Sequence, residues 1–202
     1  MPFDEYSNEY DNWFIKNQNI YNSELNAIKS FISPGLYGIE IGVGTGRFAK
    51  PLCIEMGVEP SNYMAKIARS RGIKVFNGVA ENLPIGDAEF DFSLMVTAIC
   101  FFDDVKKAFK EAYRILKHDG FLVVAFIDKE SKLGRFYKGH KQNNKFYKNA
   151  TFYSVKEITD LLISEGFKNL EYNQTVYNSE NVMQKIESGY GRGSFIVIKA
   201  YK

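Results

Sequence analysis

The stretch GIEIGVGTGR, residues 38–47, combines a short apolar strand, an acid at Glu40 and three glycines spaced two residues apart. Gly42, Gly44 and Gly46 allow positive φ angles and let the backbone come within contact distance of a ligand, which a Cβ atom would prevent. A loop of this kind is typical of a nucleotide-type cofactor site. A dinucleotide loop, G-x-G-x-x-G, needs its third glycine at the last position of this stretch, where the chain has arginine, so the spacing argues against NAD.

Strand-like and helical runs alternate on both sides of this loop. Strands are expected at 36–41, 53–58, 74–76, 90–96, 121–127, 167–177 and 194–201, and helices at 47–52, 62–71, 104–117 and 155–165. Such alternation indicates an α/β fold with a parallel sheet and helices on both faces, which also explains the nearly continuous apolar strands. Gly120, after the third of these helices, is expected to provide a left-handed helix cap.

An acid follows the second expected strand, in Glu59-Pro60-Ser61. At the carboxyl end of a parallel strand a carboxylate lies beside the ribose of a cofactor seated on the first loop, and it can accept hydrogen bonds from both ribose hydroxyls. Glu59 could instead cap the next helix, but Ser61 is the better N-cap residue. The sequence therefore favours the ribose role for Glu59.

Four patches of the chain resemble motifs of the class I S-adenosylmethionine (SAM) dependent methyltransferases. EIGVGTG (40–46) resembles motif I, NGVAENLPI (77–85) resembles G-D-A-E-x-L-P-F, the region after the fourth strand resembles motif IV, and EAYRILKHDGFL (111–122) resembles E-x-x-R-x-L-K-P-G-G-x-L. The resemblance covers roughly residues 36–127. The chain is identified as a member of this family, of the type 11 group that includes the methyltransferases of ubiquinone and menaquinone biosynthesis.

The resemblance implies SAM as the cofactor and assigns residues to it. The glycine loop would pack against the methionine and ribose, with Glu40 at the methionine end. Met64 would face the adenine, although it could equally be plain helix core. A valine replaces the aspartate of the third motif, so adenine recognition is expected from the backbone near Ala80 or from Glu81. Thr97, where the fourth strand ends, would lie near the reactive methyl group.

The fold implied by the resemblance is a Rossmann-like, doubly wound, seven-stranded sheet, mostly parallel with an antiparallel last strand. With 202 residues, 45% of them hydrophobic and 25% charged, the chain can bury one sizeable core. We expect a single domain: an N-terminal helical lid (1–34), a SAM-binding core (35–128), a substrate-cap insertion (129–153), and a C-terminal helix with the last two strands (154–202).

The amino-acid composition limits the classes of binding partner that we expect for the protein. The 26 basic and 24 acidic residues give a formal charge of +2, which does not point to nucleic acid or a membrane. No apolar run approaches the length of a membrane helix, and the first five residues are acidic where a signal peptide would be basic, so we expect a cytoplasmic protein. Cys53 and Cys100 are isolated in apolar surroundings, which favours free core cysteines over a disulfide or a metal site.

The N-terminal segment 3–32 is a candidate for substrate contact. Its aromatic residues fall at near-helical spacing, and in similar enzymes such a segment covers the cofactor as a lid. Tyr10 or Trp13 could then touch the ligand. The alternative is an amphipathic helix that packs its aromatic stripe on the core.

A second candidate is the segment 129–150, which interleaves seven basic residues with aromatic ones against a single acid. It could recognise an anionic or aromatic substrate through residues such as Tyr137, it could bind RNA, or it could be a solvated cap. His140 is the residue there with a pKa suited to a general base, and it is a weak candidate because histidines in basic loops are usually solvated. No other catalytic base is evident.

The sequence therefore predicts a SAM-dependent methyltransferase that releases S-adenosylhomocysteine. The N-P-P-Y motif of enzymes that methylate nucleobase amines is missing after the fourth strand, where the chain has TAIC (97–100) with Ile99 near the expected acceptor. This favours a small-molecule acceptor. The alternatives are an RNA or protein methyltransferase that uses the segment 129–150, and a non-catalytic protein that binds SAM or another nucleotide.

Overall fold

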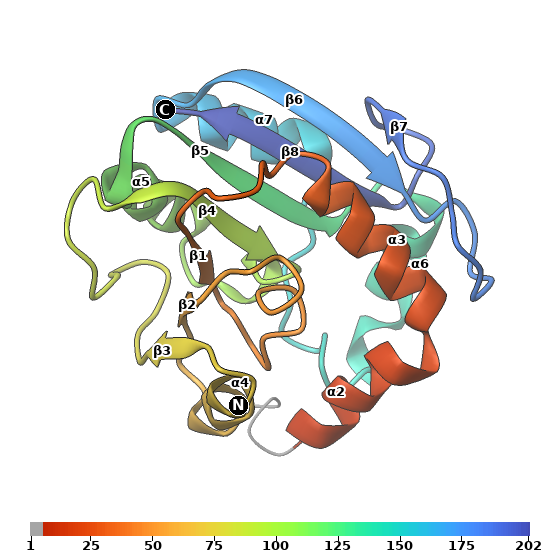
Figure 1. The fold of residues 1–202 in the computed structure, drawn as a ribbon. Helices are drawn as coiled ribbons and strands as arrows, with labels where there is room; N and C mark the ends of the chain where they lie inside the picture. The colour runs from red at the N-terminus through yellow and green to blue at the C-terminus, as the bar shows by residue number, and fades with distance from the viewer. Residues whose placement is uncertain (1–5) are drawn as a thin grey trace.

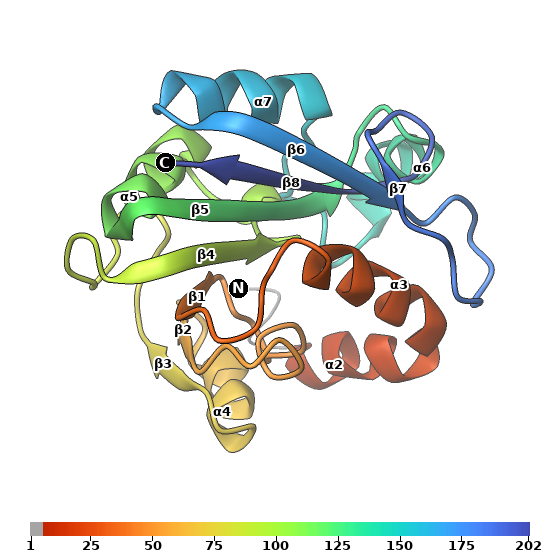
Figure 2. The ribbon, with the colours of Figure 1, turned by 45° about the horizontal axis from the view of Figure 1, so that its top comes forward.

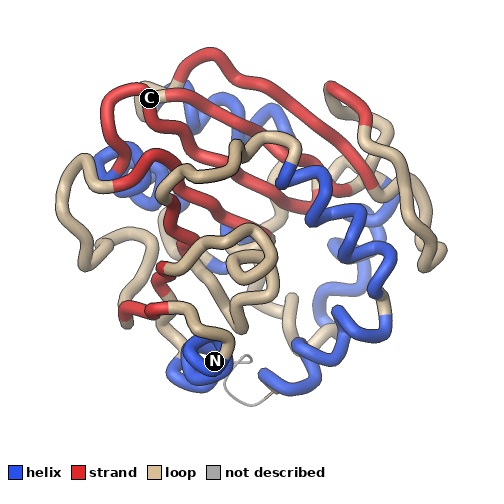
Figure 3. The backbone as a smooth tube through the Cα atoms, in the orientation of Figure 1, coloured by secondary structure: helices blue, strands red, loops and turns tan. Residues whose placement is uncertain are grey.

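The computed structural model describes residues 6–202, so the first five residues of the expected lid lie outside the described chain. An eight-stranded sheet runs through the molecule with helices on both faces (Figures 1 and 3). The strands are β1 (Gly38–Ile41), β2 (Met56–Val58), β3 (Lys74–Phe76), β4 (Phe90–Val96), β5 (Leu116–Ile127), β6 (Lys168–Thr175), β7 (Glu187–Ser188) and β8 (Phe195–Tyr201). The helices are α2 (Ser7–Lys16), α3 (Gln18–Lys29), α4 (Asn62–Ser70), α5 (Val105–Ile115), α6 (Lys132–His140) and α7 (Val155–Ser164), with short 3-10 turns at Ile99–Phe101 and Lys141–Asn143.

The strand order is β3-β2-β1-β4-β5-β8-β6-β7. β1 to β5 pair in parallel, whereas β8 pairs antiparallel with both β5 and β6. The doubly wound α/β fold and the antiparallel last strand are thus confirmed. The sheet has one strand more than the seven expected, because β7 adds a two-residue edge strand to β6 at Asn173 and Gln174. The order reverses between β1 and β4, which makes their carboxyl ends the place for a ligand.

The side chains of successive residues in the central strands point to opposite faces of the sheet. In β5, Leu122, Val124 and Phe126 join the core under α5 and α7, and Phe121, Val123 and Ala125 join the core under α2, α3 and α4. Figure 2 shows these two groups of helices on opposite sides of the sheet. Because side chains alternate along a strand, a sheet covered on both faces needs apolar residues at every position, as these strands have.

The helix expected at 47–52 is absent and the chain forms turns there. Pro51 cannot donate the backbone hydrogen bond that a helix would direct to Arg47. The Arg47 carbonyl instead accepts a 2.5 Å hydrogen bond from the Tyr21 hydroxyl. The turns end at Cys53 with a φ of 58°. Cys53 is exposed, so its expected place in the core was wrong, whereas Cys100 is partly buried and both cysteines are free.

The expected left-handed cap at Gly120 was also wrong, because the left-handed residue is Asp119, with a φ of 64°. Gly120 lies inside β5, where a Cβ atom would come within 2.9 Å of the Lys117 carbonyl oxygen and 3.0 Å of the Asp91 carbonyl oxygen. Glycine is needed there for close approach of two backbones and not for a positive φ.

Two further features concern the described residues as a whole. None of the helices in residues 6–202 has the length and apolar character that crossing a bilayer would demand. Across the same residues, His, Cys, Asp and Glu side chains form no group of three or more that could hold a metal ion.

Candidate functional site

The glycine loop lies at the carboxyl end of β1, beside the end of β4. Gly42 has a φ of 73°, and a Cβ atom on it would lie 2.8 Å from the Cβ atom of Ala98. Gly44 has a φ of 53°, and the nearest atom to a Cβ there is the Met64 methyl, at 3.4 Å. Gly46, with a φ of 79°, packs against Ile73. The loop therefore packs tightly through Gly42 and Gly46 and is more open at Gly44.

The Glu59 carboxylate joins this loop to the end of β2. One oxygen accepts a 2.9 Å hydrogen bond from the Gly44 N–H and the other accepts one of 2.9 Å from the Ser61 N–H. Ser61 caps α4, as expected, by accepting from the Met64 N–H at 3.3 Å. Pro60 between them is exposed. A carboxylate accepts up to about four hydrogen bonds, so these two leave the ribose role of Glu59 open as a prediction.

Glu40 is a buried carboxyl, only 2% exposed. Its Oε2 atom has no hydrogen-bond partner among residues 6–202, while the Ala49 N–H bonds to the carboxyl group. Burial raises the pKa of Glu40 well above its usual range. An unpaired buried acceptor is costly, and a cationic donor relieves that cost. The ammonium group of SAM is such a donor, so this end of the loop fits the methionine part of the cofactor.

On the expected adenine side, the Glu81 carboxylate is used by the fold. Its Oε1 atom accepts hydrogen bonds from the Asp103 N–H at 2.8 Å and the Asp104 N–H at 3.2 Å, just before α5. Met64 and Ala80 are buried. Their proposed contacts with adenine remain predictions, and for Glu81 such a contact would have to be made alongside these two bonds.

Thr97 ends β4 in a left-handed conformation, with a φ of 48°. This conformation is strained for a β-branched residue, and such strain is concentrated at functional sites. The Thr97 side chain hydrogen-bonds with Tyr10 of α2, which brings one of the two aromatic lid candidates to the site. Trp13 is 38% exposed and its ring packs edge-on against Phe14, so the structure does not place it with Tyr10 and Thr97.

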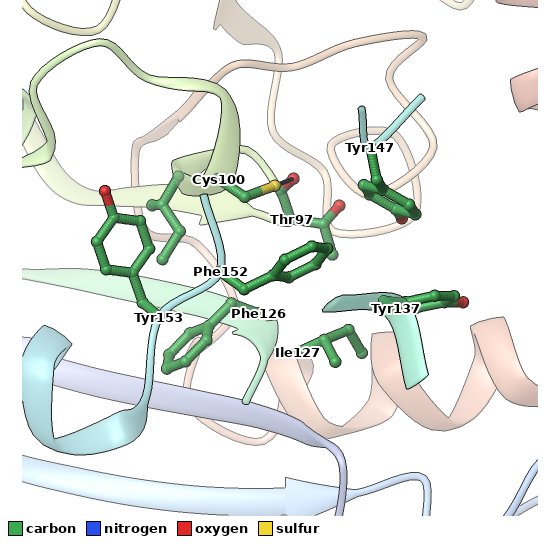
Figure 4. A pocket seen from close by; sticks show the side chains of 9 residues that line it. Thr97, Cys100, Phe126, Ile127, Tyr137, Tyr147, Phe152 and Tyr153 are labelled. Carbon is green, nitrogen blue, oxygen red and sulfur yellow. Dashed lines mark hydrogen bonds between the residues drawn. The ribbon is translucent and has the colours of Figure 1, made fainter. Parts of the chain in front are cut away.

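A pocket opens next to Thr97, and Figure 4 shows its lining. It brings together Thr97, Ile99, Cys100, Phe126, Ile127, Tyr137, Tyr147, Phe152 and Tyr153. The cavity of about 20 Å³ has room for about one water molecule, so the aromatic lining leaves little free space. Burial raises the pKa of the Cys100 thiol to about 12, which keeps it protonated and unreactive.

Three of the expected residues, Thr97, Ile99 and Tyr137, thus meet in one pocket. Six others were missed. Tyr147, Phe152 and Tyr153 belong to two adjacent pairs of aromatic residues in the segment 146–153. This concentration of aromatic residues was the sequence feature from which they could have been predicted. Phe126 and Ile127 end an apolar strand, and the sequence predicts only a structural role in the core for them.

The structure does not bring His140, the weak catalytic candidate, to this pocket. It is exposed near the end of α6, and its Nδ1 atom lies 2.9 Å from the Phe136 carbonyl oxygen of its own helix. Its ring also stacks on the Phe136 ring at 4.3 Å. His140 therefore lies on the exposed surface of α6 and makes no contact with Thr97.

Three lysines of the segment 129–150 make polar contacts within the protein, two of them with residues outside the segment. Lys129 pairs with Glu157 at 2.5 Å, Lys141 donates to the Ala150 carbonyl at 2.6 Å, and Lys145 pairs with Glu9 of α2. The aromatic residues of the segment contact one another, with the Tyr137 and Tyr147 ring centroids 5.1 Å apart. The segment is therefore folded, while Lys132, Arg135, Lys138 and Lys148 remain exposed on its surface.

Asp11 of α2 fastens the N-terminal helices to the glycine loop. It accepts hydrogen bonds from Thr45 at 2.8 Å, from Arg47 at 2.5 and 2.9 Å, and from Arg71 at 2.7 Å. Burial raises the pKa of Asp11, but the bonds from Arg47, Arg71 and Thr45 outweigh burial and hold that pKa well below its usual range. Helix α2 and the glycine loop are thus joined in one charged hydrogen-bond network.

We expect Asp11→Asn to lower the free energy of unfolding by about 1–2 kcal/mol at neutral pH, because it leaves Arg47 and Arg71 without their carboxylate. A depressed carboxyl pKa contributes stability above the unfolded pKa that is lost as pH falls through the folded pKa. The difference from wild type should therefore persist at about pH 5 and vanish only in strong acid. Urea unfolding measures it. Asp160→Asn, which breaks only the exposed pair with Lys156, is the control, and an equal loss in both variants would contradict the prediction.

Comparisons with known proteins agree with this geometry. The model of the methyltransferase domain family matches residues 39–124. An uncharacterized protein of Methanocaldococcus jannaschii is 48% identical over 202 residues, covering 99% of this chain and 98% of that protein. A ubiquinone/menaquinone biosynthesis C-methyltransferase of Rickettsia bellii is 44% identical over 66 residues, which are 32% of this chain and 27% of that protein.

A crystal structure from Thermotoga maritima is similar over the whole chain. It is described as a SAM-dependent methyltransferase and possible histamine N-methyltransferase. Its sequence is 50% identical, the TM-score is 0.97, and the match covers 100% of this chain and 98% of that one. The chain therefore belongs to the family of SAM-dependent methyltransferases and takes SAM as its cofactor.

Proposed function

We propose that this protein transfers a methyl group from SAM to a small-molecule acceptor in the pocket beside Thr97. One observation carries the proposal: the cofactor loop and the pocket adjoin. A Cβ atom on Gly42 would lie 2.8 Å from Ala98, the neighbour of Thr97 in the pocket wall. A methyl donor on the loop and an acceptor in the pocket would then be held side by side, which is most of what such a transfer requires.

The roles of the residues follow from their positions. Glu40 would hold the methionine end of SAM, Gly44 and Glu59 the ribose, and the segment from Ala80 the adenine. When bound, SAM supplies a methyl group that its sulfonium already makes electrophilic. The protein's part is to orient the acceptor and exclude water, and the aromatic lining of the pocket suits both tasks.

In this proposal the chain is one domain with three working parts. Residues 35–128 hold the cofactor, the N-terminal helices up to 34 form the lid, and 129–153 form the cap over the acceptor, followed by 154–202 with α7, β6, β7 and β8. Because the cavity has room for about one water molecule, the acceptor must displace the cap rings to enter. The Thermotoga maritima relative's description concerns a small amine, an acceptor of the size that such a pocket can enclose.

A screen of small acceptors with radiolabelled SAM tests the proposal, with Tyr137→Ala as the decisive variant. We expect methyl transfer by wild type, and in Tyr137→Ala a kcat/KM at least about 10-fold lower with an unchanged Kd for SAM, since only the acceptor pocket loses a wall. Phe136→Ala is the matched control, because Phe136 is the exposed neighbour on the same helix. SAM binding without transfer to any acceptor would favour a non-catalytic SAM-binding protein.

RNA methylation by the segment 129–150 makes a different prediction. Neutralised phosphates give binding that falls steeply with salt. We expect the protein to show no such RNA binding in fluorescence anisotropy, because Lys141 and Lys145 are engaged within the protein. Salt-sensitive binding that is lost in the triple variant Lys138→Glu, Lys141→Glu, Lys145→Glu would instead support an RNA substrate.

A further inference from the structure

Glu24 lies in the middle of the buried face of α3. It is 6% exposed, and the buried residues Ile20, Ala27 and Ile28 lie on the same side of the helix, one turn before and one turn after it. An apolar residue would be expected at this position. A carboxyl group at this position is expected to have a polar partner, because glutamates are almost never fully buried unless they are paired.

The described part of the fold does not provide that partner. The Glu24 carboxyl has no hydrogen-bond or ion-pair partner within residues 6–202, and burial alone raises its pKa to about 8. Its neighbour Ser23, also buried, is fully used, because its hydroxyl donates to the Asn19 carbonyl and accepts from the Gln184 N–H. The fold thus satisfies the adjacent polar group and leaves Glu24 unsatisfied.

The helix that carries Glu24 packs in the same apolar cluster as one wall of the proposed acceptor pocket. α3 shares one apolar cluster with Ile127 of the pocket wall and Leu133 of α6, and Figure 4 shows an N-terminal helix passing behind Ile127 and Tyr137. Burial and then the charge of Glu24 raise the pKa of Tyr137, and Glu24 also contributes to the raised pKa values of the buried Tyr147 and Tyr10. The carboxyl therefore lies within electrostatic range of these tyrosines.

These observations indicate the charge of a ligand that would pair with the Glu24 carboxyl. The faces of aromatic rings and a carboxylate both attract cations, and a desolvated site strengthens both attractions. Glu40 and Glu59 add to the negative potential at Tyr10 from the cofactor side. An anionic acceptor would be repelled by an ionised Glu24, whereas a cation would favour the ionised carboxylate and complete the arrangement.

We propose that the acceptor is an amine, bound as its ammonium ion by Glu24 and the rings of Tyr10, Tyr137 and Tyr147, and that the Glu24 carboxylate takes the proton which the nitrogen must lose before methyl transfer. In this step one N–H bond of the ammonium breaks and one O–H bond forms on Glu24. The proton transfer gives a neutral amine and a neutral carboxylic acid, and the lone pair of the nitrogen is then available to attack the methyl group. The inference rests on the proposed function, whose acceptor class it names.

Isothermal titration tests the inference with phenethylamine and its uncharged counterpart phenethyl alcohol, each added to the protein saturated with S-adenosylhomocysteine. We expect wild type to bind the amine at least about 10-fold more tightly than the alcohol, and Glu24→Gln to lose that preference while it keeps its affinity for S-adenosylhomocysteine. Glu55→Gln, an exposed glutamate before β2, is the matched control and should behave as wild type.

The failures are distinguishable. Equal affinity of wild type for amine and alcohol, or an unchanged amine preference in Glu24→Gln, would overturn the role of Glu24. Binding of S-adenosylhomocysteine without either probe would also overturn it and leave the cofactor site intact. Absence of SAM and S-adenosylhomocysteine binding by wild type would overturn the proposed function itself. Circular dichroism of Glu24→Gln confirms that the variant is folded in every arm.

Discussion

Glu59→Ala is expected to abolish the thermal stabilisation that SAM and S-adenosylhomocysteine give to the protein. A ligand at about 100 times its Kd adds roughly 2.7 kcal/mol to the folded state, a shift that differential scanning fluorimetry resolves. The alanine removes the proposed ribose acceptor. It also releases the N–H groups of Gly44 and Ser61, which Glu59 holds at 2.9 Å, so the loop loses its order along with its ligand.

Two controls separate these effects. Glu59→Gln keeps a side chain of the same size with one carbonyl oxygen, so it should preserve part of the loop geometry and bind SAM more weakly than wild type. Glu55→Gln changes an exposed acid a few residues away and should leave the ligand-induced shift unchanged. Full SAM stabilisation of Glu59→Ala would refute the assignment of Glu59, and stabilisation by NAD would contradict the reading of the glycine loop.

Glu24→Gln is expected to make the protein more stable in mild alkali. A carboxyl whose pKa is about 8 when folded keeps its proton while the unfolded chain, with a pKa near 4.5, loses it. The folded state then binds more protons, so stability falls as pH rises through this window. Glutamine does not titrate, so the gain of the variant should be absent below about pH 4.5 and largest above about pH 8, where it reaches on the order of a few kcal/mol.

Urea unfolding at about pH 5, 7 and 9 measures this divergence. The other titratable groups on which Glu24 acts are Tyr10, Tyr21, Tyr137 and Tyr147, whose pKa values are all raised so that they stay neutral throughout, and Glu40 acts on Tyr10 and Tyr21. They are identical in both proteins and cancel in the comparison. A variant that is less stable than wild type at every pH would show that the Glu24 carboxyl is structurally satisfied. Such a result would count against an acceptor role as well.

Local sequence patterns predicted most of the sheet. The expected strands 74–76 and 90–96 match β3 and β4 exactly in extent, and Ser61 caps α4 as its side chain suggests. The match is good because apolar runs, caps and periodicity depend on neighbours in the sequence. The expected helix at 47–52 failed for an equally local reason, the missing N–H of Pro51, which outweighed a helical pattern.

The proposed acceptor side of the site was harder to predict because its residues come together only through tertiary packing. Thr97, Tyr137 and Tyr147 arrive from the end of β4, from α6 and from the loop after it. The positive φ of Thr97 has no counterpart in any spacing of residues. His140 looked suitable by its chemistry alone, and its exposed position near the end of α6 could not be inferred from the sequence.

The position of β8 between β5 and β6 has a consequence for how the chain is made. Until residues 195–201 leave the ribosome, β5 and β6 each present an unpaired edge on their shared side, and both edges are rich in groups that pair with other chains. Folding of the sheet across this gap must wait until β8 has been synthesised. A nascent chain stalled before β8, or a truncation that removes it, would be prone to aggregate before its cofactor loop could be used.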